Sequence, residues 1–295
     1  FLNINNKFKL EKDYRKIIKD KSIEAIVIST PVNTHFKIAY ESLKNNKHVF
    51  VEKPLSESSL ECKKLINLAK KNKCSLFVDH TFLYTEAVMK LKKISSQKDF
   101  GDIMYYDSTR INLGLIQSDI NVLWDLAVHD LAILNYAVNK KPKLVSAIGH
   151  KHFKSKPITA AYMTIKYQSN FVAHINVNWL SPVKLRQTIL AGSKKMILYN
   201  DLEVDEKLRV FNKGVDIIKK EDSSKNLVNY KVGDTYIPNL KNKEGLSEAV
   251  NEFYLSIKNN VPAKTDGISG LKVVKILEAA DKSMLSNGRP IKIKL

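Results

Sequence analysis

The first hundred residues of this 295-residue chain contain no glycine, since all ten glycines lie at Gly101 or beyond it. This part of the chain therefore lacks a glycine-rich turn of the kind that cradles a phosphate group. Cysteine is equally scarce: only Cys62 and Cys74 are present, with no CxxC pair and no histidine at metal-ligand spacing near them. This pattern argues against a disulfide framework or a zinc site, and we expect no metal. Reduced thiols favour a cytoplasmic location.

Long apolar runs are also absent. None approaches the roughly 20 residues needed to cross a bilayer, and the opening stretch FLNINNKFKL lacks the apolar core of a signal peptide. We therefore expect a cytoplasmic protein without a membrane partner.

Arginine makes up only 5 of the 49 basic residues, and the remaining 44 are lysines in scattered pairs. The net charge of +19 would suit a nucleic-acid-binding protein. Base reading and bidentate phosphate contacts favour arginine, however, so we expect a lysine-rich solvated surface and no nucleic-acid partner. A measured affinity for nucleic acid that falls steeply with salt would instead support a nucleic-acid-binding protein. Under both interpretations, the positive electrostatic field of the protein attracts anionic small molecules.

Short apolar strands alternate with helices in the first part of the chain. The strands are predicted at 24–30, 48–52 and 75–79, and the helices at 10–20, 33–46 and 58–72. Asn33 is a plausible N-cap, and Ser58 with Glu61 forms a capping box. Continuous apolar strands separated by helices are typical of βαβ units in a parallel sheet.

After residue 100 the pattern changes to longer, alternating, tyrosine-rich segments at 101–112, 143–153, 160–180, 186–192 and 195–200. Helices are predicted at 85–95, 124–139, 246–259 and 268–288, the last one closed by Gly288. We predict an α/β protein with two domains. Residues 1–100 would form the C-terminal part of a Rossmann-type parallel-sheet domain, and residues 101–295 an α+β domain with a large open, mainly antiparallel sheet.

Polar residues follow each predicted parallel strand. In open parallel sheets, ligands bind at the carboxyl ends of the strands, so Thr30, Glu52, Lys53 and His80 are expected to meet in one crevice. Each of them singly is also compatible with a solvated turn residue.

Asp125 and His129 stand four residues apart in the predicted helix 124–139, so they share a helix face. A histidine beside a carboxylate is a reasonable proton-transfer pair. The alternative is an aspartate that favours the helix N-terminus, with a surface histidine one turn later.

These segments together, TPVNTH, then HVFVEKPLS, then Asp125-x-x-x-His129 and a sheet-rich C-terminal half, resemble the glucose-fructose oxidoreductase and inositol dehydrogenase group, the Gfo/Idh/MocA family. The resemblance implies an oxidoreductase that exchanges a hydride between NAD or NADP and a sugar-like or cyclitol carbon. It also implies a homo-oligomer, a dimer or tetramer, formed through the open C-terminal sheet.

The resemblance assigns roles residue by residue. Lys53 matches the lysine at the reacting hydroxyl, Asp125 the carboxylate that binds substrate hydroxyls, and His129 the general acid or base. The residues implied at the cofactor are Thr30, Pro31, Asn33, His35, Glu52, Lys53, Pro54 and His80. The chain departs from the family in carrying Ala132 where many members have an aspartate, and Asp130 directly after the histidine instead.

Tyr84, Arg110 and Asn112 are further candidates for substrate contacts, because arginine and amide groups suit sugar hydroxyls and phosphates. The missing glycine turn indicates that the first βαβ portion of the family's dinucleotide domain is not in this chain. A degenerate, non-catalytic family member that acts as a binding or scaffold protein is the alternative function.

Overall fold

The computed structural model describes residues 9–154, 156–218, 227–241 and 243–294. Most of the opening stretch, and the expectation of a missing first βαβ portion, lie outside these residues. Within the described ranges, no helix has both the length and the apolar character needed to cross a membrane.

A three-stranded parallel sheet forms the first unit, in the order β1-β2-β3. Its strands are β1 (Ala25–Ile28), β2 (His48–Glu52) and β3 (Leu76–Asp79), joined by α2 (Val32–Lys44) and α3 (Ser59–Lys71) and preceded by α1 (Tyr14–Lys19). Phe77 and Val78 are fully buried, as expected of a parallel sheet covered on both faces. The predicted βαβ pattern is confirmed, although α1 is shorter than the predicted helix 10–20.

The two helix starts in this unit differ in how well the sequence predicted them. Ser58 caps α3 as predicted, because its hydroxyl accepts a hydrogen bond from the Glu61 backbone N–H at 3.2 Å. The prediction of Asn33 as an N-cap is wrong, since α2 already begins at Val32 and Pro31 occupies the cap position. Proline carries no side-chain acceptor, so α2 begins without a side-chain cap.

A nine-stranded sheet forms the second unit, in the order β13-β10-β9-β8-β4-β7-β6-β5-β14. Only the pair β4–β7 is parallel, so the expected mainly antiparallel sheet is confirmed. The strands are β4 (Ile103–Leu113), β5 (Pro142–His150), β6 (Ala160–Tyr167), β7 (Val172–Asn178), β8 (Leu180–Gly192), β9 (Met196–Asn200), β10 (Leu208–Phe211), β13 (Thr235–Tyr236) and β14 (Ile291–Lys292). A separate hairpin consists of β11 (Gly214–Ile218) and β12 (Leu227–Lys231).

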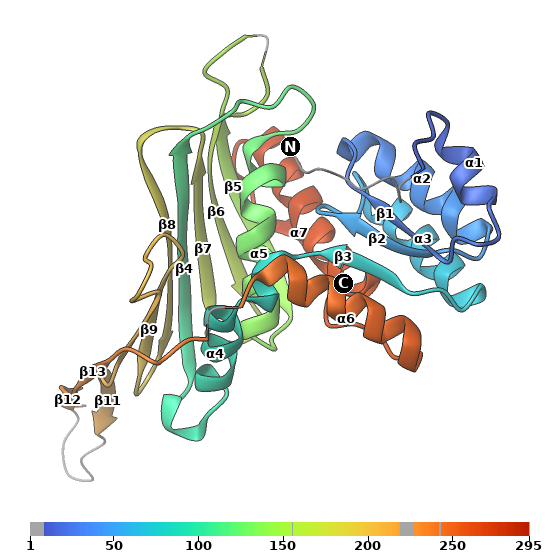
Figure 1. The fold of residues 1–295 in the computed structure, drawn as a ribbon. Helices are drawn as coiled ribbons and strands as arrows, with labels where there is room; N and C mark the ends of the chain where they lie inside the picture. The colour runs from blue at the N-terminus through green and yellow to red at the C-terminus, as the bar shows by residue number, and fades with distance from the viewer. Residues whose placement is uncertain (1–8, 155, 219–226, 242, 295) are drawn as a thin grey trace.

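Helices cover one face of this sheet and leave the other bare (Figure 1). The helices on this face are α4 (Glu86–Ser95), α5 (Val128–Ala137) and α7 (Gly267–Leu285), whereas α6 (Gly245–Asn259) packs on the small sheet through Phe253. On β7 the buried Ala173, Ile175 and Val177 alternate with half-buried or exposed residues, so every second side chain points toward the helices. Gly288 has a left-handed φ of 81° and donates its N–H to Ser283 O, which ends α7 near the predicted residue.

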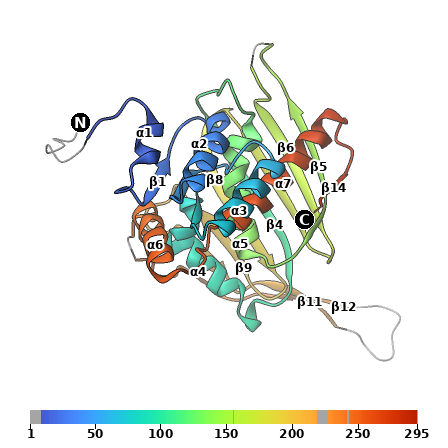
Figure 2. The same cartoon turned by 90° about the vertical axis from the view of Figure 1, so that its right-hand side faces the viewer.

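The C-terminal segment ties the two units together. The backbone of Val78 on β3 donates to Thr265 O at 2.8 Å, and the N–H of Ser59 donates to the Glu278 side chain on α7 at 2.8 Å. Seen from the side of the three-stranded sheet, the large sheet lies behind α3, α5 and α7 (Figure 2). The carboxyl ends of β1 to β3 therefore stand at a fixed position relative to the start of α5.

Candidate functional site

The register of the small sheet brings the carboxyl ends of its three strands to one edge. Ile28 pairs with Val51, and Glu52 pairs with Asp79, so residues that follow β1, β2 and β3 lie at one edge. Thr30 and Pro31 are exposed at this edge, whereas His80 is buried. This edge thus has a solvent-facing rim with buried residues beneath it, and we refer to it as the crevice.

His35 connects two of the loops at this edge. Its ring is 1% exposed, with Nδ1 at 2.9 Å from Pro54 O and Nε2 at 2.8 Å from Thr30 O. It therefore holds the β1 and β2 loops at a set separation rather than facing the crevice. The Lys53–Pro54 peptide bond in the second loop is cis.

Lys53 reaches across to Asp125. Its Nζ donates to Asp125 Oδ1 at 3.2 Å and to the Asp125 backbone carbonyl at 3.1 Å, and both side chains are about one-fifth exposed. The other carboxylate oxygen, Oδ2, accepts a hydrogen bond from the indole Nε1 of Trp179 at 3.0 Å. Both oxygens of Asp125 are thus oriented by donors from two different units.

The segment that carries Asp125 is a π-helical turn, Leu123–Ala127, which passes directly into α5. Such turns interrupt α-helices mostly as single-turn bulges and are frequent at functional sites. Because the bulge lies before Val128, His129 falls in the first turn of α5, close behind the crevice. The expectation of one regular helix over 124–139 is therefore corrected at its start.

His129 is a neutral imidazole in this environment. Burial is the main cause that lowers its pKa well below the usual value, and the nearby charges of Lys53, Arg110 and Arg186 lower it further. Its Nδ1 is shielded from solvent and has no hydrogen-bond partner within the described residues. The ring packs edge-on against Phe82, with centroids 5.0 Å apart. A neutral imidazole presents an unprotonated ring nitrogen, which is the form required of a proton acceptor.

The floor of the crevice holds a second unpaired histidine and two carboxyl groups. His80 is 2% exposed, and within the described ranges neither ring nitrogen has a hydrogen-bond partner. Burial, followed by the charge of Lys53, lowers its pKa to about 4. Burial also raises the pKa of Glu52 and of Asp79, and for Glu52 the neighbouring Asp79 charge adds to the effect. Buried polar atoms without partners are rare, so the nitrogens of His80 are available to a ligand.

Two of the predicted substrate residues do not face the crevice. Arg110 is 3% exposed, and its guanidinium donates to Asp130 at 2.9 and 3.2 Å. Tyr84 is 2% exposed, and its hydroxyl contacts Thr265 at 2.9 Å. The prediction of these two side chains as substrate contacts is wrong, because their polar groups are already engaged in the interior. Asn112 is half-buried at the carboxyl end of β4.

Sequence reasoning missed Trp179 and Arg186. Trp179 is 1% exposed and lies near the end of the 160–180 segment, so only the tertiary contact with Asp125 reveals its role. Arg186 pairs with Arg110 in register across β8 and β4, and its guanidinium contacts Asp201 at 3.1 Å. Asp201 lines a polar hollow of about 660 Å³ together with the start of α4.

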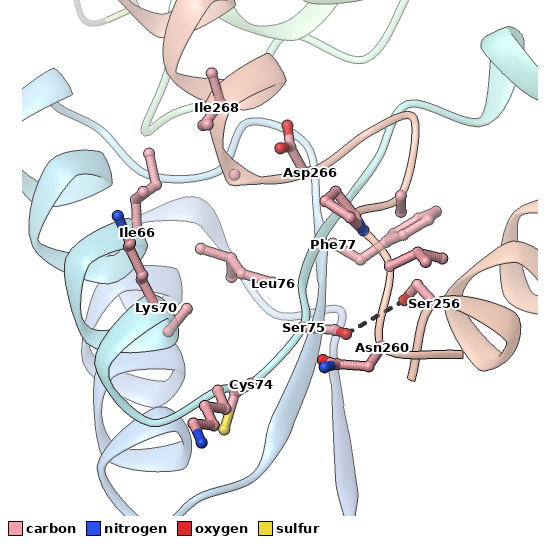
Figure 3. Close-up of a pocket in the computed structure, with 16 residues that line it drawn as sticks. Ile66, Lys70, Cys74, Ser75, Leu76, Phe77, Ser256, Asn260, Asp266 and Ile268 are labelled. Carbon is pink, nitrogen blue, oxygen red and sulfur yellow. Dashed lines mark hydrogen bonds between the residues drawn. The ribbon is translucent and has the colours of Figure 1, made fainter. Parts of the chain in front are cut away.

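Another hollow, of about 380 Å³, lies at the opposite end of β3 (Figure 3). Its labelled residues include Cys74, Ser75, Asn260 and Asp266, and a hydrogen bond of 3.3 Å joins Ser256 to Ser75. Ligands of open parallel sheets bind at the carboxyl ends of the strands, whereas Ser75 precedes β3. We therefore assign the candidate site to the Lys53 end.

The crevice fits the nicotinamide half of a dinucleotide better than its pyrophosphate. Unpaired nitrogens of His80 and the Lys53 ammonium suit polar groups of a bound ring and ribose. A glycine turn for the pyrophosphate has no counterpart in residues 1–100. Clusters of three or more histidine, cysteine or acidic side chains able to hold a metal are absent from the described residues.

Comparison with protein families agrees with this geometry. The sequence pattern of the GFO_IDH_MocA group, described as "Oxidoreductase family, NAD-binding Rossmann fold", matches residues 2–80. The pattern described as "GFO/IDH/MocA C-terminal domain" matches residues 88–198. The chain belongs to the Gfo/Idh/MocA family. The resemblance read from the sequence is therefore confirmed, and so is its NAD-binding class of fold.

Individual relatives within the Gfo/Idh/MocA family are distant. Inositol 2-dehydrogenase of Salmonella typhimurium is 24% identical over 45% of this chain, and the match spans only 40% of that relative's length. UDP-N-acetylglucosamine 3-dehydrogenase of Acidithiobacillus ferrooxidans is 23% identical over 85% of this chain and 76% of its own length. These relatives support the family's chemistry without fixing a substrate for this chain.

Solved structures share the fold over nearly the whole chain. The structure of the Acidithiobacillus ferrooxidans enzyme has a TM-score of 0.76 at 20% identity and covers 94% of this chain and 82% of its own. A levoglucosan dehydrogenase in complex with NADH and levoglucosan has a TM-score of 0.79 at 19% identity, covering 97% and 84%. At these identities the likeness establishes the fold alone.

Proposed function

We propose that this chain carries the hydride-transfer site of an NAD(P)-dependent oxidoreductase acting on a CH–OH or keto group of a sugar-like or cyclitol substrate. The observation that carries the proposal is the contact between Lys53 Nζ and Asp125, with Trp179 fixing the other carboxylate oxygen and His129 one turn further on. A scaffold protein has no need to converge a lysine, a carboxylate and a neutral histidine on one crevice.

Each of the three residues has a defined task in this proposal. Oxidation of a carbinol carbon requires loss of the hydroxyl proton, which neutral His129 accepts. The Lys53 ammonium stabilises negative charge that develops on the same oxygen. Asp125 accepts hydrogen bonds from substrate hydroxyl groups and, through its salt bridge, keeps Lys53 in place. In the reductive direction, His129 returns the proton.

A bound nicotinamide would supply the hydride acceptor or donor at this site. The residues that we assign to its binding are Thr30, Pro31, Asn33, His35, Glu52, Lys53, Pro54 and His80. His80 contacts the cofactor directly in this proposal, because its nitrogens are unpaired. His35 acts by holding the Thr30 and Pro54 loops together. Both NAD and NADP are tested below.

The substrate class follows from the wall opposite the cofactor. Asn112 and Asp125 offer amide and carboxylate groups suited to vicinal hydroxyls. The hollow beside Asp201 gives room for a second sugar or a nucleotide portion. Relatives named for inositol and UDP-N-acetylglucosamine support cyclitols and nucleotide sugars as the classes to test.

The bare face of the large sheet is proposed as the surface for a homodimer or homotetramer. Tyr162 is 51% exposed, Val172 38% and Ile189 37%, and all three belong to neighbouring parts of this face. Exposed apolar side chains on a sheet face that no helix covers are typical of an association surface. We further propose residues 1–100 and 101–295 as the two domains, and a cytoplasmic location in keeping with the free Cys62 and Cys74.

Titration of the chain with NADH and NADPH, followed by nicotinamide fluorescence, tests cofactor binding. Turnover is then measured with NAD⁺ and NADP⁺ against myo-inositol, UDP-N-acetylglucosamine and levoglucosan. We expect saturable binding of one cofactor and production of its reduced form with at least one substrate. Absence of binding of either cofactor to the folded chain would overturn the proposal and favour the scaffold interpretation.

A further inference from the structure

Three successive inward side chains of β4 all donate to one residue, Asp130. The Tyr106 hydroxyl donates to its backbone carbonyl at 3.0 Å, and the Ser108 hydroxyl donates to Oδ1 at 2.8 Å. Arg110 donates from Nε to Oδ2 at 2.9 Å and from its Nη2 to Oδ1 at 3.2 Å. We call Tyr106, Ser108 and Arg110 the Asp130 clamp. All of its members are at most 3% exposed.

The same arginine also contacts the ring beside His129. Its Cζ lies 4.8 Å from the centroid of Phe82, whose ring in turn packs edge-on against His129 at 5.0 Å. Arg110 thus touches the residue that follows His129 in the chain and the aromatic ring that packs against its imidazole. These two contacts approach His129 from different directions.

We propose that Arg110 is a positioning residue that sets the orientation and the proton affinity of the His129 imidazole through Asp130 and Phe82. This inference goes beyond the proposed hydride-transfer function and rests on it for the meaning of His129. It replaces the expected substrate contact of Arg110 with an indirect role.

The geometry explains why this position is one of only five arginines in a chain with 44 lysines. Arg110 meets Asp130 with two parallel N–H donors while its planar face stacks on Phe82. A lysine ammonium is a point charge that satisfies neither the bidentate geometry nor the stacking. The buried carboxylate of Asp130 requires such a partner, because an unpaired charge in the interior is strongly unfavourable.

Charge as well as shape acts on His129. Lys53 lies on the β2 side, His80 on the β3 side, and Arg110 and Arg186 on β4 and β8, and the positive charges among them oppose protonation of the ring. Two carboxylates flank the histidine along its own segment, Asp125 in the π-helical turn and Asp130 in α5. Because Arg110 neutralises Asp130, it prevents that carboxylate from favouring the charged imidazole.

The test is an NMR titration of the chain with ¹³Cε1-labelled histidine, with His129 assigned among the seven histidines from a His129→Gln spectrum. The variants are Arg110→Gln, Arg110→Lys and Phe82→Leu. Arg209→Gln, which removes an exposed arginine paired with Glu206, is the matched control. The titration needs no turnover, so it remains informative if the hydride-transfer proposal fails.

We expect Arg110→Gln to raise the pH midpoint of the His129 titration, whereas Arg209→Gln leaves this midpoint unchanged. Arg110→Lys is expected to keep the midpoint close to that of the parent but to change the Cε1–H shift, because the stacked geometry with Phe82 is lost. Phe82→Leu is expected to change the shift likewise. If Arg110→Gln does not fold, the last two variants decide. Unchanged His129 signals in every folded variant would overturn the proposal.

Discussion

The ammonium of Lys53 lies 3.2 Å from the carboxylate of Asp125, although 72 residues separate them in the chain. Lys53 follows β2 of the small parallel sheet, and Asp125 lies in the π-helical turn that packs against the large sheet. This salt bridge therefore joins the small-sheet unit to the large-sheet unit, which are the cofactor side and the substrate side in the proposed function. The proposed chemistry requires both sides at once, so this contact is the most direct target for mutation.

Replacing Lys53 tests the charge at the reacting oxygen. For Lys53→Met we expect kcat/KM to fall by about 100-fold or more, the loss typical of removing one preorganised electrostatic group. Steady-state kinetics with the best substrate and cofactor provide the measurement. Lys37→Met, at an exposed position on α2, is the control and should retain parent activity. Parent-like turnover in Lys53→Met would remove this residue from the mechanism.

Trp179→Phe tests how tightly Asp125 must be held. The substitution removes the indole donor to Oδ2 together with part of a buried ring, and we expect a fall of about 10-fold in kcat/KM. Trp124→Phe is the matched control, because its indole N–H donates to Asp281 Oδ2 at 2.7 Å instead. Equal losses of turnover in the two variants would argue against a specific role for Trp179.

The buried His80 predicts a loss of stability in mild acid. Its folded pKa of about 4 lies below the ordinary histidine value of 6.5, so the unfolded chain binds the proton more readily. Stability is then complete above pH 6.5 and falls as the pH is lowered toward 4, by about 3 kcal/mol from this group. Comparing denaturant unfolding of the parent and His80→Gln across pH 4 to 7 isolates the effect, and identical pH slopes would contradict it.

If the uncovered face of the large sheet forms the proposed homo-oligomer interface, one charged substitution on it should disrupt the oligomer. For Ile189→Lys, sedimentation velocity should show a shift from oligomer to monomer, because an ammonium is costly in an apolar interface. Leu60→Lys is the control, since Leu60 is 63% exposed on α3, away from that face. An unchanged sedimentation coefficient in Ile189→Lys would place any interface elsewhere.

The parallel-sheet unit could be predicted closely because its signals are local. Strands 48–52 and 75–79 are continuous apolar runs, and Ser58 caps α3 through a contact three residues away. The crevice followed from the same information, since the carboxyl ends of adjacent parallel strands must share one edge.

Whether an individual polar side chain faces the crevice or the interior depended on tertiary contacts that the sequence does not show. Arg110 and Tyr84 carry polar groups suited to a substrate. In the folded chain, however, Arg110 is hydrogen-bonded to Asp130 and Tyr84 to Thr265. The alternation along β4 already put Tyr106, Ser108 and Arg110 on one face. Which face is buried was decided only by the packing of α5 upon it.

His35 also limits how the crevice loops are able to vary. Both of its ring nitrogens face main-chain carbonyls, those of Thr30 and Pro54, so the link depends on no side chain in either loop. Substitutions of the loop side chains therefore change the contacts with a ligand, whereas the separation of the two loops stays the same. Exchange of rim residues one at a time would therefore leave the separation of the two loops, as His35 sets it, unchanged.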